Sequence, residues 1–65
     1  MTVNDLVKQV KAKGREIKFI GVTERDGRWA DAQLEYPDEF LETEGDREVF
    51  DCAYQSVQKI LVIKF

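Results

Sequence analysis

The chain offers few side chains for catalysis. Its 65 residues include no histidine, so the commonest general base at neutral pH and the commonest metal ligand are both missing. The single cysteine, Cys52, lies in an apolar-rich stretch with no histidine to activate its thiol, and Ser56 has no evident base partner. The four glycines are isolated, so no phosphate-binding loop is present. We therefore expect no catalytic residue, no cofactor and no metal, and we expect that the protein is not an enzyme.

Carboxylates are concentrated in one stretch of the sequence. Between residues 35 and 48 the acidic side chains are Glu35, Asp38, Glu39, Glu42, Glu44, Asp46 and Glu48. Their spacing does not match the oxygen ligands and glycine turn of an EF-hand loop, and metal binding is the least favoured interpretation. A solvated loop that aids solubility and a docking surface for a basic partner both stay open. For docking, we single out Asp38, Glu39 and Glu42.

The basic residues lie mostly in the first half. Residues 1–28 carry seven basic and four acidic side chains, whereas residues 29–65 carry three basic and nine acidic ones. This asymmetry indicates either ordinary solvated faces or a polarised molecule that associates head to tail or steers a charged partner. Lys8 and Lys11 would be neighbours on a helix, but the isoelectric point near 4.8 disfavours nucleic acid as a partner.

The stretch 17–36 is expected to organise the fold, because two runs of strand-forming residues flank Asp26-Gly27. This dipeptide favours a two-residue type I′ hairpin turn, in which both residues have positive φ. The register then places Lys18 opposite Glu35, which is a favourable pair of charges. The other expected pairs include Thr23 with Ala30, Gly21 with Ala32, Phe19 with Leu34 and Ile17 with Tyr36.

Residues 2–13 are predicted to form a helix. The apolar stripe consists of Val3, Leu6, Val7 and Val10, at positions i, i+3, i+4 and i+7. Thr2 and Asp5 resemble a capping box, and Gly14 is placed to end the helix in the left-handed conformation. We expect this stripe to pack on one face of the hairpin, formed by Ile17, Phe19, Leu34 and Tyr36.

Trp29 is the most informative single residue. In the expected register it lies on the opposite face of the hairpin, near Ile20 and Val22. That face needs cover from the chain itself or from a partner, because soluble proteins rarely leave large apolar patches in water. Tryptophan is also a favoured anchor in protein interfaces. Ile20, Val22 and Trp29 are therefore predicted to bind a partner.

The remaining elements are harder to assign. Pro37 stops the second strand, and residues 38–45 are an acidic segment with no assigned secondary structure, which Phe40 and Leu41 are expected to hold against the core. Residues 60–65 form an apolar, β-rich run that we predict as a strand added to the hairpin. An open edge of that strand would be a second surface for a partner.

Residues 46–59 combine helical periodicity with a composition typical of strands. We favour a helix with Asp46 as its N-cap, because a turn within residues 55–58 would lack glycine, proline, asparagine or aspartate. The alternative is a strand over residues 48–55, a turn and a last strand.

The predicted fold is one α+β domain over residues 1–65: an N-terminal helix, the hairpin, a second helix and a C-terminal strand, in the order α-β-β-α-β. If residues 46–59 form no helix, one helix packs on a four-stranded antiparallel sheet instead. One cysteine allows no internal disulfide, and no apolar run approaches a membrane span or a signal-peptide core. We expect a complete, cytoplasmic protein that does not bind membranes.

These expectations favour a small non-catalytic interaction or regulatory protein, which binds a protein partner or itself as a homodimer. A core of this size supplies little net stability, and association would add to it. Two alternatives stay open. One is an acidic inhibitor or nucleic-acid mimic that blocks a basic protein surface. The other is an accessory subunit of a larger complex.

Overall fold

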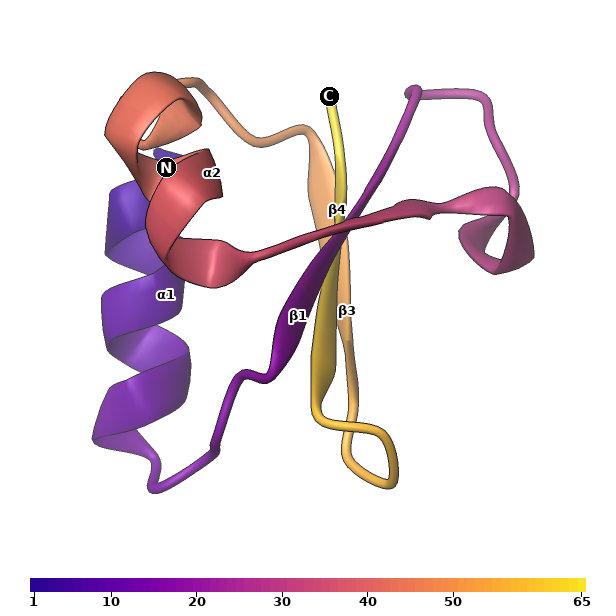
Figure 1. The fold of residues 1–65 in the computed structure, drawn as a ribbon. Coiled ribbons are helices and arrows are strands. Elements are labelled where there is room, and N and C mark those ends of the chain that lie inside the picture. Colours follow the sequence, from indigo (N-terminus) through magenta and orange to yellow (C-terminus); the bar gives the residue numbers. More distant parts are fainter.

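The computed structural model describes residues 1–65, and in it two helices cover one face of a four-stranded sheet (Figure 1). The elements are α1 (Val3–Ala12), β1 (Phe19–Thr23), the 3-10 turn η1 (Trp29–Asp31), β2 (Gln33–Glu35), α2 (Pro37–Glu44), β3 (Asp51–Gln55) and β4 (Ile60–Lys64). No helix has the length and apolar character that crossing a bilayer requires.

The sheet has the strand order β2-β1-β4-β3, with β1 and β4 parallel and the two outer pairs antiparallel. The α+β class is confirmed, but the element order is α-β-β-α-β-β rather than α-β-β-α-β. The predicted alternative has the right number of strands and lacks α2 and the parallel pair. Because β4 has a neighbour on each side, the prediction that residues 60–65 offer an open edge is wrong, and the edges are β2 and β3.

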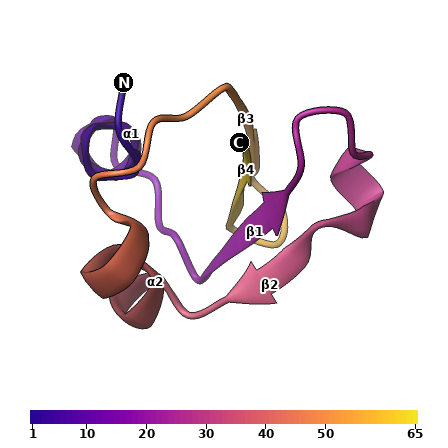
Figure 2. The same ribbon diagram turned by 90° about the horizontal axis from the view of Figure 1, so that it is seen from above.

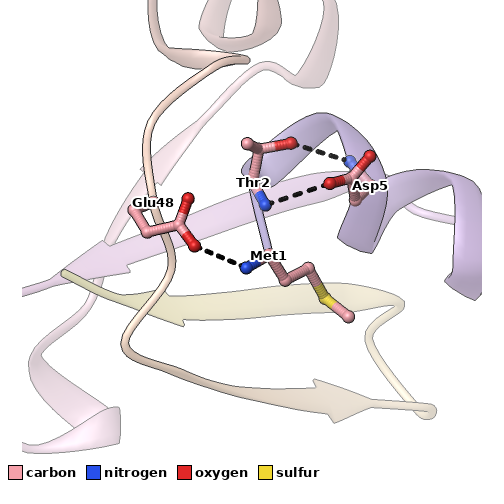
Figure 3. A network of polar contacts seen from close by, with 4 residues as sticks. All are labelled: Met1, Thr2, Asp5 and Glu48. Atoms are coloured by element: carbon pink, nitrogen blue, oxygen red, sulfur yellow. Dashed lines mark hydrogen bonds and ion pairs between the residues drawn. The ribbon is translucent and has the colours of Figure 1, made fainter.

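Helix α1 forms where the sequence predicts it. The Thr2 hydroxyl accepts a hydrogen bond from the Asp5 backbone N–H at 3.2 Å, and the Asp5 carboxylate accepts one from the Thr2 N–H at 3.3 Å (Figure 3). This capping box satisfies two backbone donors at the start of the helix. After the helix, Gly14 adopts the expected left-handed conformation, with φ of 79°. The buried stripe consists of Val3, Leu6, Val7 and Val10.

Strands β1 and β2 form the predicted antiparallel pair, but Asp26-Gly27 does not form a two-residue turn. Neither residue has the positive φ that a type I′ turn requires. Instead the Gly27 N–H donates to the Glu24 carbonyl at 2.9 Å, and the chain passes through η1 before β2 begins. This longer connection shifts the register by two residues, so Gly21 pairs with Leu34. A shift of two leaves the same side chains of β1 and β2 sharing a face, although it does not decide which face the helices cover.

Most of the acidic segment 38–45, to which the sequence assigns no regular structure, belongs to helix α2 together with Pro37. Pro37 stands in the first turn, where its missing N–H has no cost, and Asp38 and Glu39 complement the positive end of the helix dipole. Phe40 is buried in the core, and Leu41 packs against it, as expected for these two residues. With so few apolar residues, this segment has no stripe that reveals a helix in the sequence.

The helix predicted over residues 46–59 is wrong. This stretch contains strand β3 and the turn into β4, as in the alternative. The strand-like composition prevails over the helical periodicity because β3 finds a partner in β4. The turn has none of the usual turn residues, but Lys59 supplies a left-handed conformation, with φ of 58°. Asp46 follows the end of α2 and caps no helix.

The core lies between the helices and one face of the sheet (Figure 2). The sheet face under the helices carries Ile20, which has no exposed surface, and not Phe19 as predicted. The parallel pairing of β1 with β4 explains this choice, because it sets Ile20 beside Leu61 and Val22 beside Ile63. These pairs create one continuous aliphatic surface, whose burial drives the packing of the helices. The buried cluster consists of Val3, Leu6, Val7, Val10, Ile20, Phe40, Leu61 and Ile63.

The first residues are tied to the segment between α2 and β3. The backbone hydrogen bonds are Val3 to Arg47 (3.0 Å), Asn4 to Gly45 (2.8 Å) and Val49 to Met1 (2.9 Å). Gly45 is buried, and a Cβ there would lie 2.5 Å from the Leu41 carbonyl and 2.6 Å from the Asn4 amide nitrogen. The Met1 ammonium group donates to the Glu48 carboxylate at 2.5 Å, which raises the pKa of the amine (Figure 3).

Candidate functional site

The two helices leave the opposite face of the sheet without a covering helix (Figures 1 and 2). We call this surface the open face, and it consists of Phe19, Trp29, Leu34, Tyr36, Ile60 and Val62. Three of its large side chains are well exposed: Trp29 by 37%, Leu34 by 51% and Tyr36 by 65%. The rings of Phe19 and Tyr36 pack against each other, with centroids 5.6 Å apart. Val62, by contrast, is only 7% exposed beneath the segment around η1, so the open face meets water mainly at Trp29, Leu34 and Tyr36.

The segment around η1 lies on the open face because Gly21 has no side chain. A Cβ at Gly21 would lie 3.2 Å from the Ala32 Cβ and 3.3 Å from a Val62 methyl group, which is tighter than ordinary contact. The small residues Gly21 and Ala32 thus let the chain cross close above β1. This close approach brings Trp29 over the sheet instead of leaving it at the tip of a hairpin.

One cation lies over the indole of Trp29, and an ion pair closes the turn that carries it. The Lys64 ammonium group lies 4.3 Å from the centroid of the indole ring, within range of a cation–π contact. The η1 turn is closed by an ion pair between Arg28 Nε and Asp31 Oδ2 at 3.2 Å. The indole is therefore oriented before any partner arrives, which lowers the entropy lost on binding.

A hollow of about 230 Å³ lies beside Trp29 on the open face. Its lining includes Trp29, Ala32, Leu34, Ile60 and Val62, with the side-chain amide of Gln58 among its few polar groups. A mostly apolar concavity with few polar groups favours an apolar side chain as its occupant. The hollow and the exposed indole together resemble the anchor-and-pocket pattern of protein interfaces.

The predicted partner-binding residues do not form one surface. Ile20 is fully buried under the helices, and Val22 packs against the core on the same side of the sheet. Trp29 lies on the other side, so the expectation that these three residues share a face is wrong. The prediction assumed that Trp29 belongs to the second strand and that its side chains alternate regularly up to the turn. Instead η1 interrupts this strand before β2 begins.

The three predicted acidic residues do lie together, on helix α2. Asp38, Glu39 and Glu42 are exposed, and none of them forms an ion pair. Only Glu44 of this helix has a basic partner, with its carboxylate 3.7 Å from Arg47. These side chains form an uncompensated acidic helix surface, separate from the open face.

The open-face residues of β4 carry a sequence signal that the prediction did not use. Residues 60–63 are apolar at every position, which is the pattern of a strand buried on both faces. The helices cover only the side of Leu61 and Ile63. On the other side the chain around η1 already buries Val62 and leaves Ile60 half-buried, so part of this second face is covered by the protein itself.

Cys52 is an exposed thiol with no activating neighbour. Desolvation by surrounding groups raises the pKa of this thiol, and the adjacent Asp51 carboxylate raises it further. The thiol is therefore mostly protonated at neutral pH, which is the less nucleophilic form. No group of three cysteine, aspartate or glutamate side chains converges in a way that could hold a metal ion.

The chain matches no protein-family model, no curated protein sequence and no solved structure.

Proposed function

We propose that the protein is a non-catalytic interaction or regulatory protein, whose open face binds a protein partner or a second copy of the chain. The observation that carries this proposal is the side of the sheet that has no covering helix, where Trp29, Leu34 and Tyr36 remain exposed. Fully burying an exposed large apolar side chain contributes roughly 1.5–3 kcal/mol, and the exposed 37–65% of these three side chains leaves part of that gain for association. The protein acts either as a free regulator or as an accessory subunit of a larger complex.

The test is the substitution Trp29→Ala. We expect it to abolish a specific complex recovered with tagged protein from cells that produce it, or to convert a self-associated form to monomers. The reason is that interfaces depend on a few aromatic anchors, whose loss costs at least about 2 kcal/mol, or more than tenfold in affinity. Light scattering on a sizing column measures the assembly, and circular dichroism verifies the fold.

Phe50→Ala is the matched control. Phe50 is also an exposed aromatic residue, and it also stacks with a cation, with the Arg25 guanidinium 4.2 Å from its ring centroid. It belongs to neither the open face nor the hollow. A complex that survives Trp29→Ala, or that is lost equally with Phe50→Ala, would contradict the proposal.

A second candidate function uses helix α2. The exposed and unpaired carboxylates of Asp38, Glu39 and Glu42 favour an acidic inhibitor or nucleic-acid mimic that blocks a basic protein surface. Such a complex weakens steeply between about 0.05 and 0.5 M salt, because exposed charges are screened. Binding through the open face changes little over that range, so the salt dependence separates the two functions.

A further inference from the structure

A second apolar groove lies between α1 and the edge strand β3, on the helix side of the sheet. Its volume is about 290 Å³, and its lining includes Leu6, Val10 and Lys13 of α1, Cys52 and Tyr54 of β3, and the buried Leu61 of β4. The two walls are joined only near their ends. At one end the Val49 N–H donates to the Met1 carbonyl at 2.9 Å, and at the other the Tyr54 hydroxyl donates to the Glu16 carbonyl at 2.5 Å.

Over β3 itself the outer wall of this groove is a free strand edge, because β4 is its only neighbour, whereas the residues just before β3 are paired with the N-terminal segment through an antiparallel bridge between Thr2 and Glu48. Backbone groups of successive residues point to opposite sides of a strand. The Phe65 N–H donates to the Thr23 carbonyl at the end of β1. Val62 lies three positions earlier, so its backbone groups point to the other side of β4 and pair with those of Ala53 in β3. The two neighbours of Ala53 therefore direct their backbone groups outward. These outward-facing residues are Cys52 and Tyr54.

One of these outward groups already has a local partner. The Cys52 N–H donates to the Asp51 carboxylate at 2.8 Å. A side chain in this position protects the edge against indiscriminate pairing, and an incoming strand would have to displace it. The affinity of this edge for a strand is therefore set partly by Asp51.

The end of the groove beside Tyr54 is basic. Lys13 and Arg15 line it, neither forms an ion pair, and the Arg15 guanidinium lies 5.3 Å from the Tyr54 ring centroid. The Glu16 carboxylate nearby is engaged by Lys59 at 3.0 Å. The free charge at this end is therefore positive and complements a carboxylate.

We propose that this groove binds an extended, acidic peptide segment of a partner protein, which adds to β3 as a fifth strand. Its backbone pairs with Cys52 and Tyr54, and an aliphatic side chain enters the groove beside Val10. A carboxylate of the same segment pairs with Lys13 and Arg15. Strand addition of this kind obtains affinity from the backbone and specificity from alternate side chains. The site does not depend on the open face, which lies on the other side of the sheet.

The test uses a capped peptide, Glu-Thr-Val-Thr-Glu-Thr, whose valine and glutamates share one face of a strand, titrated into ¹⁵N-labelled protein at low salt. We expect the largest amide shift changes at residues 52–54 and slower hydrogen exchange of the Tyr54 amide at saturation. A matched peptide with lysine in place of each glutamate should bind at least about tenfold more weakly, because its charges meet Lys13 and Arg15. The Trp29→Ala variant should bind the acidic peptide normally, which separates this site from the open face.

Three variants sharpen the test. Combined Lys13→Glu and Arg15→Glu should weaken the acidic peptide about tenfold, whereas Lys8→Glu, on the opposite side of α1, should leave its affinity unchanged. Asp51→Ala should strengthen binding, because it removes the group that competes for the Cys52 N–H. The proposal would be overturned by the absence of shift changes at residues 52–54 at millimolar peptide, or by equal binding of the lysine peptide. Concentration-dependent protection of Tyr54 without peptide would assign this edge to a second copy of the chain instead.

Discussion

At Lys59 the backbone adopts a left-handed conformation, with φ of 58°, which costs a residue with a Cβ roughly 1–2 kcal/mol. Two contacts hold the residue there. Its carbonyl accepts the Lys18 N–H at 2.8 Å, and its ammonium group lies 3.0 Å from the Glu16 carboxylate. The hydrogen bond and the charge attraction raise the pKa of Lys59 and lower the pKa of Glu16. Contacts from the chain before β1 therefore fix a turn that its own sequence does not specify.

Lys59→Gly tests whether the backbone or the ion pair dominates at this turn. We expect the free energy of unfolding to rise by about 0.5–1 kcal/mol, because glycine adopts positive φ without strain and an exposed ion pair contributes little. Urea unfolding, followed by the fluorescence of the single tryptophan, measures the change. Glu16→Gln, which removes only the ion pair, serves as the control and should have little effect. A less stable Lys59→Gly variant would mean that the contact with Glu16 determines the turn.

Asp5 links the stability of α1 to pH. Its pKa lies below the ordinary value, first because the Thr2 backbone N–H donates to its carboxylate and second through the Thr2 side chain. A carboxyl group with a lowered folded-state pKa stabilises the protein fully above its unfolded value, near pH 4, and loses this contribution as the pH falls through the folded value. We therefore expect the stability difference between the parent protein and Asp5→Asn to shrink as the pH falls from about 5 to about 2. A difference that stays constant over this range would contradict the capping role of the carboxylate.

Helices and strands are predictable from the sequence where the residues that determine them lie within one short segment. Helix α1 is predictable because its capping box, apolar stripe and terminating Gly14 all lie within one short segment. Helix α2 has only Phe40 and Leu41 as apolar residues and gives no periodic signal. Strand β3 conflicts with a helical pattern, and only its pairing with β4 resolves the conflict. Whether this segment forms a helix or a strand depends on residues outside it, so residues 46–59 alone do not predict it.

The candidate site, too, is predictable where its signals are local and unpredictable where they depend on distant residues. Trp29 is recognisable as an exposed anchor from its residue type, but its neighbours depend on which face of the sheet the helices cover. That choice follows from the pairing of β1 with β4, whose residues are about forty positions apart. Gly21 and Ala32 are a local hint, because two small residues on one face permit a close crossing of the chain.

The contact between the N-terminal segment and the end of α2 gives a prediction at this scale. Gly45→Ala should lower the free energy of unfolding by about 1–3 kcal/mol, because the new methyl group would overlap the Leu41 carbonyl and the Asn4 side chain. Gly14→Ala is the comparison. It has no atom within 4 Å of the added carbon and is strained only by its φ of 79°. Urea unfolding of both variants measures the effects, and a Gly45→Ala variant as stable as the parent would show that the two segments separate easily.

The whole molecule is small, and its charges are mixed more evenly than the sequence suggests. Helix α1 belongs to the predominantly basic first half of the chain, and α2 belongs to the predominantly acidic second half. The two helices lie side by side in one layer, so opposite charges do not lie at opposite ends of the molecule (Figure 2). A chain of this length has a free energy of unfolding of roughly 3–10 kcal/mol. Covering the open face by a partner would add to that stability.

Site-specific photo-crosslinking tests most directly whether the open face is an interface. A photoreactive phenylalanine analogue replaces Leu34 on the open face, and a control replaces Val57, which is 90% exposed at the turn before β4. Irradiation of cells that produce each variant should give one discrete adduct from position 34 and none from position 57. An adduct of twice the chain mass identifies a second copy, and any other mass identifies a different protein. No adduct from position 34, or the same adducts from both positions, would contradict the account.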